Sequence, residues 1–190
     1  MAVVISAVWA CQFFLAGLPL FWAAGLAITG IAALVLAYFT LSHVASRVDR
    51  FLDPSSGDSY QVDRSLEAFM NGGLFGRGPG EGTVKEVLPD AHSDFVFAVA
   101  GEEFGLFVCL IIVCLFGFVV LRGFAKALQE TDLFILLATS GLVVQFGLQA
   151  VINMGSTLRL MPTKGMTLPF VSYGGSSLIA MGLCIGFLLA

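Results

Sequence analysis

The sequence predicts an all-α integral membrane protein with about five transmembrane helices and one long loop outside the membrane. Composition is the first reason: 58% of the 190 residues are hydrophobic and 12% are charged, which leaves more apolar side chains than a soluble domain of this size buries. The second reason is that apolar runs of about twenty residues recur, the length of a helix that crosses a membrane. These runs are continuous and do not alternate with polar residues, which argues against a transmembrane barrel.

The net charge and the positions of the cysteines bear on the partners and on the sites that the chain could have. The net charge of −4 describes the loops and says little about a nucleic-acid partner, but the sequence contains no basic cluster that would indicate one. Cys11, Cys109, Cys114 and Cys184 all lie in apolar runs without C-x-x-C spacing, so we interpret them as small hydrophobic side chains. No basic segment precedes the first apolar run, so we expect that run to remain as a span. Because the chain starts and stops inside apolar runs, we expect it to be a segment of a longer protein.

Residues 1–41 are predicted to form two transmembrane helices, at about 2–16 and 20–41. Gly17 and Pro19 interrupt an otherwise apolar tract, and proline cannot continue a helix without the loss of a backbone hydrogen bond. At about 1.5 Å per residue the second helix is long enough to cross the hydrocarbon core, whereas the first is short.

Residues 42–93 form the long polar loop, within which a short amphipathic helix is expected. Its apolar and charged residues recur on opposite faces of a helix: Val62, Leu66, Phe69 and Met70 against Asp63, Arg64 and Glu67. Such a helix suits the membrane surface. Further along, glycines surround Arg77 between residues 72 and 80. We favour a structural turn over a phosphate cradle there, because no strand precedes it and no helix obviously opens from it.

The third transmembrane helix is expected over 94–121, and it begins with an aspartate. Carboxylates inside a span are unfavourable unless they face a polar cavity or a partner. On a regular helix Glu102 lies about 12 Å beyond Asp94 and about 80° round the axis, while Glu103 points nearly opposite. Only Glu102 is therefore expected to share a cavity with Asp94. Ser93 and Asp94 also suit the N-terminus of a helix, so the spacing leaves capping and catalysis both open.

The fourth transmembrane helix, 133–157, carries a polar stripe. Gln145, Gln149 and Asn153 fall at i, i+4 and i+8 and so share one helical face. Amides in lipid need partners, so the stripe is expected to face the interior of the bundle. It would serve either as glue between helices, which we favour, or as the wall of a hydrated site.

Residues 158–171 are predicted to form a re-entrant-like loop ahead of a fifth transmembrane helix, 172–190. Two prolines in this loop, at positions 162 and 169, bracket Lys164. An irregular backbone at membrane depth is tolerated only where protein or water satisfies its polar groups. Lys164 would then be a cation suited to a phosphate, and a solvated loop lysine is the alternative.

Several of these motifs occur together in one known family. The stretches PDAHSDF at 89–95, GEEFG at 101–105, PTKGMTLP at 162–169 and SYGGSS at 172–177 closely resemble the SEDS peptidoglycan polymerases. The Pro-Asp-Ala-His form is closer to the division branch, FtsW, than to the elongation branch, RodA. Ser93 stands where the family usually has threonine. The resemblance covers essentially the whole chain, and it matches only the C-terminal half of the family's sequence.

The resemblance implies a peptidoglycan glycosyltransferase that polymerises lipid II into glycan strands during cell division and releases undecaprenyl pyrophosphate. Asp94 matches the family's essential acidic residue and would be the catalytic base. Six other residues form the candidate substrate-binding set: Arg77, His92, Glu102, Lys164, Ser176 and Ser177. No organic cofactor is expected. A divalent cation, Mg or Mn, is a candidate for stabilising the leaving group, and its ligands stay open.

The same resemblance implies a multi-pass protein of the bacterial cytoplasmic (inner) membrane at the division septum, with 42–93 as an extracytoplasmic loop. Expected partners are a class B penicillin-binding transpeptidase and other divisome proteins, besides the lipid substrate and product. Two alternative functions stay open: a lipid II flippase, and a non-catalytic scaffold for the division transpeptidase. Glycan formation from lipid II by purified protein separates the enzyme from the flippase. The scaffold predicts that Asp94→Asn leaves function intact.

Overall fold

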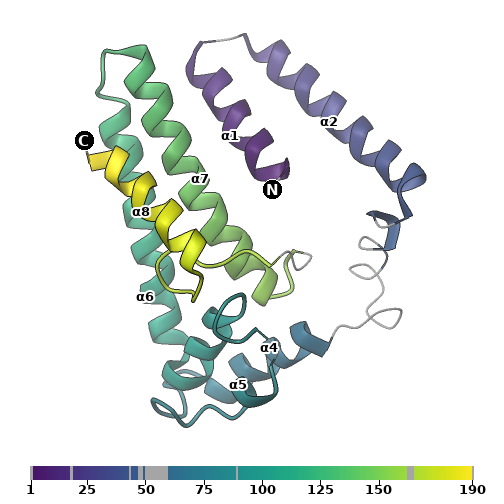
Figure 1. Cartoon of the computed structure of the whole chain (residues 1–190), viewed down its shortest axis with the longest axis vertical. Coiled ribbons are helices and arrows are strands. Elements are labelled where there is room, and N and C mark those ends of the chain that lie inside the picture. The colour runs from purple at the N-terminus through teal and green to yellow at the C-terminus, as the bar shows by residue number, and fades with distance from the viewer. Residues whose placement is uncertain are drawn as a thin grey trace.

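The chain is all-α in the residues that the computed structural model describes, which are 2–17, 19–42, 44–46, 49, 60–88, 90–161 and 165–189. Figure 1 shows α6 (Val96–Ala127) beside α7 (Leu133–Thr157), with α4 (Tyr60–Gly72) and α5 (Val84–Val87) at one end of the pair. Both α6 and α7 are long and apolar enough to cross a membrane. The all-α prediction is confirmed, whereas the number of spans stays a prediction.

Three further apolar helices lie close to their expected bounds. They are α1 (Ala2–Leu15), α2 (Leu20–Thr40) and α8 (Gly175–Leu189). Helix α1 packs against α7, where the Gln12 side-chain amide donates to the Leu137 carbonyl at 3.3 Å. Helix α7 coincides with the predicted 133–157, because the Asp132 carboxylate caps its first turn.

Helix α6 is not the single straight span that the sequence predicted. Gly105 has φ 77° and ψ −174°, which no α-helix contains. A Cβ added at Gly101 would lie 3.5 Å from the Cys109 sulfur, whereas residues eight apart in a continuous helix are separated by about 12 Å along the axis. The helix therefore bends sharply at Gly105 into a short first part, 96–104, and a long second part, 106–127.

The bend corrects the expected position of the two glutamates. The second part is about 33 Å long at ~1.5 Å per residue, enough by itself to cross a membrane. Glu102 and Glu103 belong to the short first part, ahead of the bend. The span of 94–121 is therefore replaced by one of about 106–127, which contains no carboxylate.

A glycine-rich loop fills the space at the bend. Breaking a helix leaves backbone donors and acceptors without partners, and residues 73–78 supply them. Four backbone hydrogen bonds of 3.0 to 3.4 Å join the loop to α6: Arg77 N to Glu102 O, Gly78 N to Glu103 O, Leu106 N to Gly73 O and Phe107 N to Leu74 O. A Cβ at Gly76 would lie only 2.2 Å from the Glu103 carbonyl oxygen. The loop is thus a structural turn, as the sequence favoured.

Helix α4 is the predicted amphipathic helix, although it buries a different face. Its buried residues are Ser65, Ala68 and Gly72, whereas Met70, assigned to the apolar face, is 84% exposed. Small side chains face α6 because the two backbones nearly touch: a Cβ at Gly72 would lie 1.9 Å from the Gly101 carbonyl oxygen. Periodicity located the helix, but close packing selected the buried face.

The main core lies where the long helices meet the segment after residue 164. Leu168 is almost completely buried there, so an irregular segment enters the bundle between helices. Aromatic rings of α6 and α7 meet in the same core, with the Phe116 and Phe146 centroids 5.5 Å apart. The buried residues of this core are Phe97, Cys109, Phe116, Phe146, Ala150, Met154, Leu168 and Met181.

We predict that Gly105→Ala strongly destabilises the protein. The backbone conformation at Gly105 is open essentially to glycine alone and costs other residues about 1–3 kcal/mol. A Cβ would also lie 2.4 Å from the Gly76 backbone nitrogen. Gly117→Ala, on the second part of α6 with no atom within 4 Å of the added Cβ, is the matched control and should be neutral or slightly stabilising. Thermal unfolding in detergent measures both, and equal melting temperatures would contradict the bend.

Candidate functional site

Asp94 lies in a tight turn that ends just before α6. The Asp90 carbonyl accepts hydrogen bonds from the backbone nitrogens of Ser93 and Asp94 at 3.0 Å and of Phe95 at 3.4 Å. Asp90 adopts φ 56°, a left-handed conformation that aspartate tolerates better than most residues. The residue that caps α6 is Phe95, with no side-chain hydrogen bond. The structure therefore contradicts the capping role that the spacing had left open for Ser93 and Asp94.

An apolar cluster beneath this turn fixes its position. The cluster joins α4, α5, the turn and the start of α6, and its buried residues are Ala68, Val84, Leu88, Ala91, Phe95 and Ala98. Burial of apolar surface stabilises by about 25 cal/mol per Å². The turn therefore cannot shift without exposing part of this cluster.

The Asp94 carboxylate is half-buried and lies against the loop that follows α7. Burial is the main cause that raises the pKa of Asp94 above its ordinary value, and the charge of Asp90 raises it further. A Cβ added at Gly165 would lie 3.1 Å from the Oδ2 atom of Asp94, and Gly165 has φ 56°. A carboxylate with a raised pKa is a stronger base than an ordinary aspartate.

Two side-chain amides of α7 hold that loop in place. Asn153 Nδ2 donates to the backbone carbonyls of Asp94 at 2.9 Å and of Met166 at 2.5 Å. Gln149 Nε2 donates to the Thr167 carbonyl at 3.0 Å. These bonds join α7 to the loop and to the turn of Asp94 and not to another helix, so the choice between glue and the wall of a hydrated site stays a prediction. Gln145 is exposed, so the expectation that all three amides face the interior is wrong.

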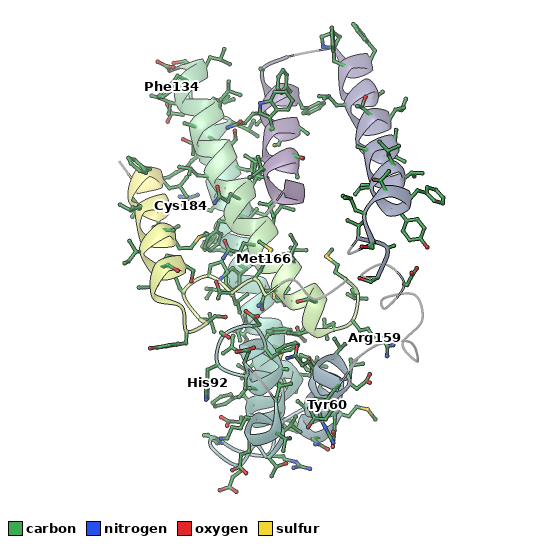
Figure 2. The ribbon with its side chains drawn as sticks, turned by 45° about the vertical axis from the view of Figure 1, so that its right-hand side comes forward. Tyr60, His92, Phe134, Arg159, Met166 and Cys184 are labelled. Atoms are coloured by element: carbon green, nitrogen blue, oxygen red, sulfur yellow. The ribbon has the colours of Figure 1, made fainter. Side chains whose placement is uncertain are left out.

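His92 lies on the other side of the turn, at a cavity. The cavity is about 860 Å³, and the exposed Tyr173 lines it together with His92. The Tyr173 backbone nitrogen donates to the His92 carbonyl at 2.9 Å. Figure 2 shows His92 at the same end of the molecule as Tyr60 and Arg159, far from Phe134. Tyr173 was missed as a candidate, although the SYGGSS motif contains it.

Glu102 does not share the position of Asp94. Its carboxylate is completely buried and accepts hydrogen bonds from the backbone nitrogen of Thr83 at 3.0 Å and of Val84 at 3.1 Å. The Arg77 guanidinium lies 3.7 Å from Glu102 Oε1 and donates to the Thr83 hydroxyl. The expected shared cavity is therefore replaced by a separate polar cluster, because the loop of residues 77–84 covers Glu102.

Glu103 also holds this loop, through an ion pair with Lys85. Its carboxylate lies 2.6 Å from Lys85 Nζ, which also donates to the Gly80 carbonyl at 2.8 Å. Both acids of the GEEFG stretch therefore bind the segment 77–85. This pairing supplies the polar partners that buried carboxylates require.

The other three candidate residues are Ser176, Ser177 and Lys164. Ser177 donates to the Gly174 carbonyl at 3.0 Å within the first turn of α8, and Ser176 is exposed. Lys164 lies outside the described residues, while its neighbour Gly165 lies beside Asp94. Among the described residues no three His, Cys, Asp or Glu side chains are grouped to hold a metal ion.

Comparison with known proteins identifies relatives over the whole chain. Residues 1–190 match the family model FtsW/RodA/SpoVE, described as cell cycle protein. A probable peptidoglycan glycosyltransferase FtsW from Caulobacter vibrioides is 48% identical over 188 residues, which cover 99% of this chain and 48% of that relative. A protein of the same name from Legionella pneumophila is 41% identical over 195 residues, 98% of this chain and 49% of that relative. The chain thus spans about half the length of the curated relatives it matches.

The fold is also similar to a solved structure. A chain from a peptidoglycan synthase complex, studied for its coordination of polymerization and crosslinking, aligns with a TM-score of 0.77 at 31% identity. The alignment covers 99% of this chain and 54% of that chain.

We predict that Glu102→Ala loosens the segment 77–85. The substitution leaves the buried backbone donors of Thr83 and Val84 without acceptors, at about 1–3 kcal/mol each. Trypsin should then cleave after Arg77 much faster than in the wild type. Glu81→Ala is the control, because the Glu81 side chain is exposed and makes no hydrogen bond or ion pair in the described part of the chain. Equal cleavage of the two variants would contradict the role of Glu102 as an anchor.

Proposed function

This chain belongs to the FtsW/RodA/SpoVE family of cell cycle proteins, and from that premise we propose that it carries the catalytic base of a peptidoglycan glycosyltransferase. The substrate is lipid II, which the enzyme joins into glycan strands during cell division. The observation that carries the proposal is Asp94, a carboxylate with a raised pKa. It is held against the loop that follows Lys164. The names of the FtsW relatives support the same reaction.

In the proposed mechanism Asp94 acts as a general base. It takes the proton from the acceptor sugar hydroxyl as that oxygen attacks the anomeric carbon of the donor. The new glycosidic C–O bond forms while the bond from the anomeric carbon to the pyrophosphate oxygen breaks. The proton stays on Asp94 until it passes to water, and undecaprenyl pyrophosphate leaves. Partial burial suits this role because it raises the proton affinity of the carboxylate.

Lys164 and His92 are the proposed contacts to substrate. Lys164 precedes Gly165, which adjoins Asp94, and we propose that the Lys164 ammonium acts on the pyrophosphate as a point charge. His92 lines the neighbouring cavity. The proposal for Lys164 fails if Lys164→Met leaves the KM for lipid II unchanged. We assign Arg77 and Glu102 instead to the anchoring of the loop, since they contact each other and Thr83.

A divalent cation fits the site only with help from the substrate. Asp94 and Asp90 are the carboxylates of the turn, and Mg²⁺ is commonly held by one or two carboxylates together with substrate phosphates. An ion bound to Asp94 would lower the proton affinity that a general base needs, so we propose that the ion is held by the substrate phosphates beside the turn and not by these two carboxylates. Bound there, the ion would stabilise negative charge on the leaving pyrophosphate.

The proposed setting is the bacterial cytoplasmic membrane at the division septum. Five spans, formed by α1, α2, residues 106–127, α7 and α8, would place residues 42–93 outside the membrane. A class B penicillin-binding transpeptidase is the proposed partner. The similarity to a chain of a complex that couples polymerization to crosslinking supports that choice.

We predict that Asp94→Asn abolishes glycan synthesis and leaves folding intact. The amide has nearly the same shape, but it cannot accept the proton. The assay uses the complete gene product, purified in detergent, with lipid II as substrate and gel analysis of the glycan chains. Detergent removes the membrane that a flippase would need, so synthesis by the wild type excludes flipping as the sole activity. Normal glycan synthesis by a folded Asp94→Asn variant would contradict the catalytic role of Asp94 and would favour the non-catalytic scaffold.

We predict that Asp90→Asn moves the acid limb of the activity profile to lower pH. Asp94 must be ionised to act as a base, and the charge of Asp90 disfavours its ionisation. Removing that charge lowers the pKa of Asp94, so activity persists further into acid. Asparagine tolerates the positive φ of residue 90, so the turn is retained.

The control for this shift is Glu130→Gln. Glu130 is exposed and lies between α6 and α7, so its loss changes the net charge by the same amount outside the turn. The acid limb of this variant should match the wild type. If the acid limb of the pH–activity profile is the same in Asp90→Asn as in the wild type, ionisation of Asp94 does not limit the rate.

A further inference from the structure

We propose that Asn153 is a positioning residue that holds the Asp94 turn and the segment 165–168 in one fixed arrangement. The proposal rests on the proposed function, because it concerns the placement of the proposed catalytic base. Asn153 lies on α7 and is completely buried. It joins two segments that are distant from each other in the sequence.

The geometry of the amide carries the inference. A side-chain amide has two N–H donors, and Nδ2 of Asn153 lies 2.9 Å from the Asp94 carbonyl oxygen and 2.5 Å from that of Met166. One side chain thus satisfies one carbonyl from each segment. The opposite orientation of the amide would turn its oxygen toward two carbonyl oxygens, which repel it. Two acceptors therefore determine the orientation of Asn153.

The polar stripe of α7 provides a comparison within the same helix. Gln149, one turn before Asn153, donates to Thr167, through its carbonyl at 3.0 Å and its hydroxyl at 3.4 Å. In the described part of the chain it makes no side-chain hydrogen bond to the turn of Asp94, so it holds the segment 165–168 alone. Gln145, one turn earlier still, is exposed and makes no side-chain hydrogen bond in the described part of the chain. Asn153 therefore holds both segments, Gln149 holds one of them, and Gln145 holds neither.

This graded series predicts a separation of kinetic effects. Loss of the Asn153 amide frees the turn of Asp94, so proton abstraction slows and kcat falls. Loss of the Gln149 amide frees only the segment next to Lys164, so binding weakens and KM for lipid II rises while kcat stays within about twofold of the wild type. Gln145→Leu should change neither constant.

The experiment compares Asn153→Leu, Gln149→Leu and Gln145→Leu in the complete gene product. Leucine nearly matches the shape of asparagine and removes both donors. We expect kcat for lipid II polymerisation to fall at least tenfold only in Asn153→Leu. A kcat in that variant equal to that of Gln149→Leu would overturn the proposal. If Asn153→Leu does not fold, Asn153→Ser, which keeps one donor in a smaller side chain, takes its place with the same expected direction.

Amide hydrogen exchange tests the same proposal without activity. Exchange should accelerate in both 90–95 and 165–168 in the Asn153 variant, and only in 165–168 in Gln149→Leu. Unchanged exchange in 90–95 would refute the positioning role. A wild type that fails to polymerise lipid II would instead refute the proposed function, so the two failures are distinguishable.

Discussion

The sharp bend of α6 at Gly105 is the constraint on which the other contacts around the site depend. It turns residues 96–104 back against the second part of the helix and leaves backbone groups that the loop of residues 73–78 must pair. Because the backbones approach so closely, glycine is required at the contact points, such as Gly72 and Gly76. The same bend brings both glutamates under the segment 77–85, where they act as anchors.

Asp94 owes its environment to three separate supports. An apolar cluster lies beneath its turn, an amide of α7 holds its carbonyl, and a glycine of the following loop leaves room for its carboxylate. The carboxylate is therefore partly removed from water without an ion pair in the described residues, which raises its pKa. The base that we propose benefits from this arrangement, because a lysine contact to the carboxylate itself would lower its proton affinity.

Helix α7 is the element that connects the parts of the site. Its apolar face forms the core with α6, and its polar stripe binds the segment that precedes α8. The amides replace water as partners for the carbonyls of a buried irregular segment, which is the condition for such a backbone among apolar helices. A single helix thus fixes both the bundle and the position of the proposed base.

The sequence by itself determined the helices and the candidate acid. Apolar runs specify helices through composition and length, which are local properties, and α7 accordingly has its predicted bounds. Asp94 was identified from its position at the start of an apolar run and from the PDAHSDF motif. Only the tertiary structure decided that Glu102 anchors a loop, that Asn153 reaches the turn of Asp94, and that α6 bends at Gly105. These outcomes depend on which distant backbone groups remain to be paired, and periodicity along one helix carries no information about them.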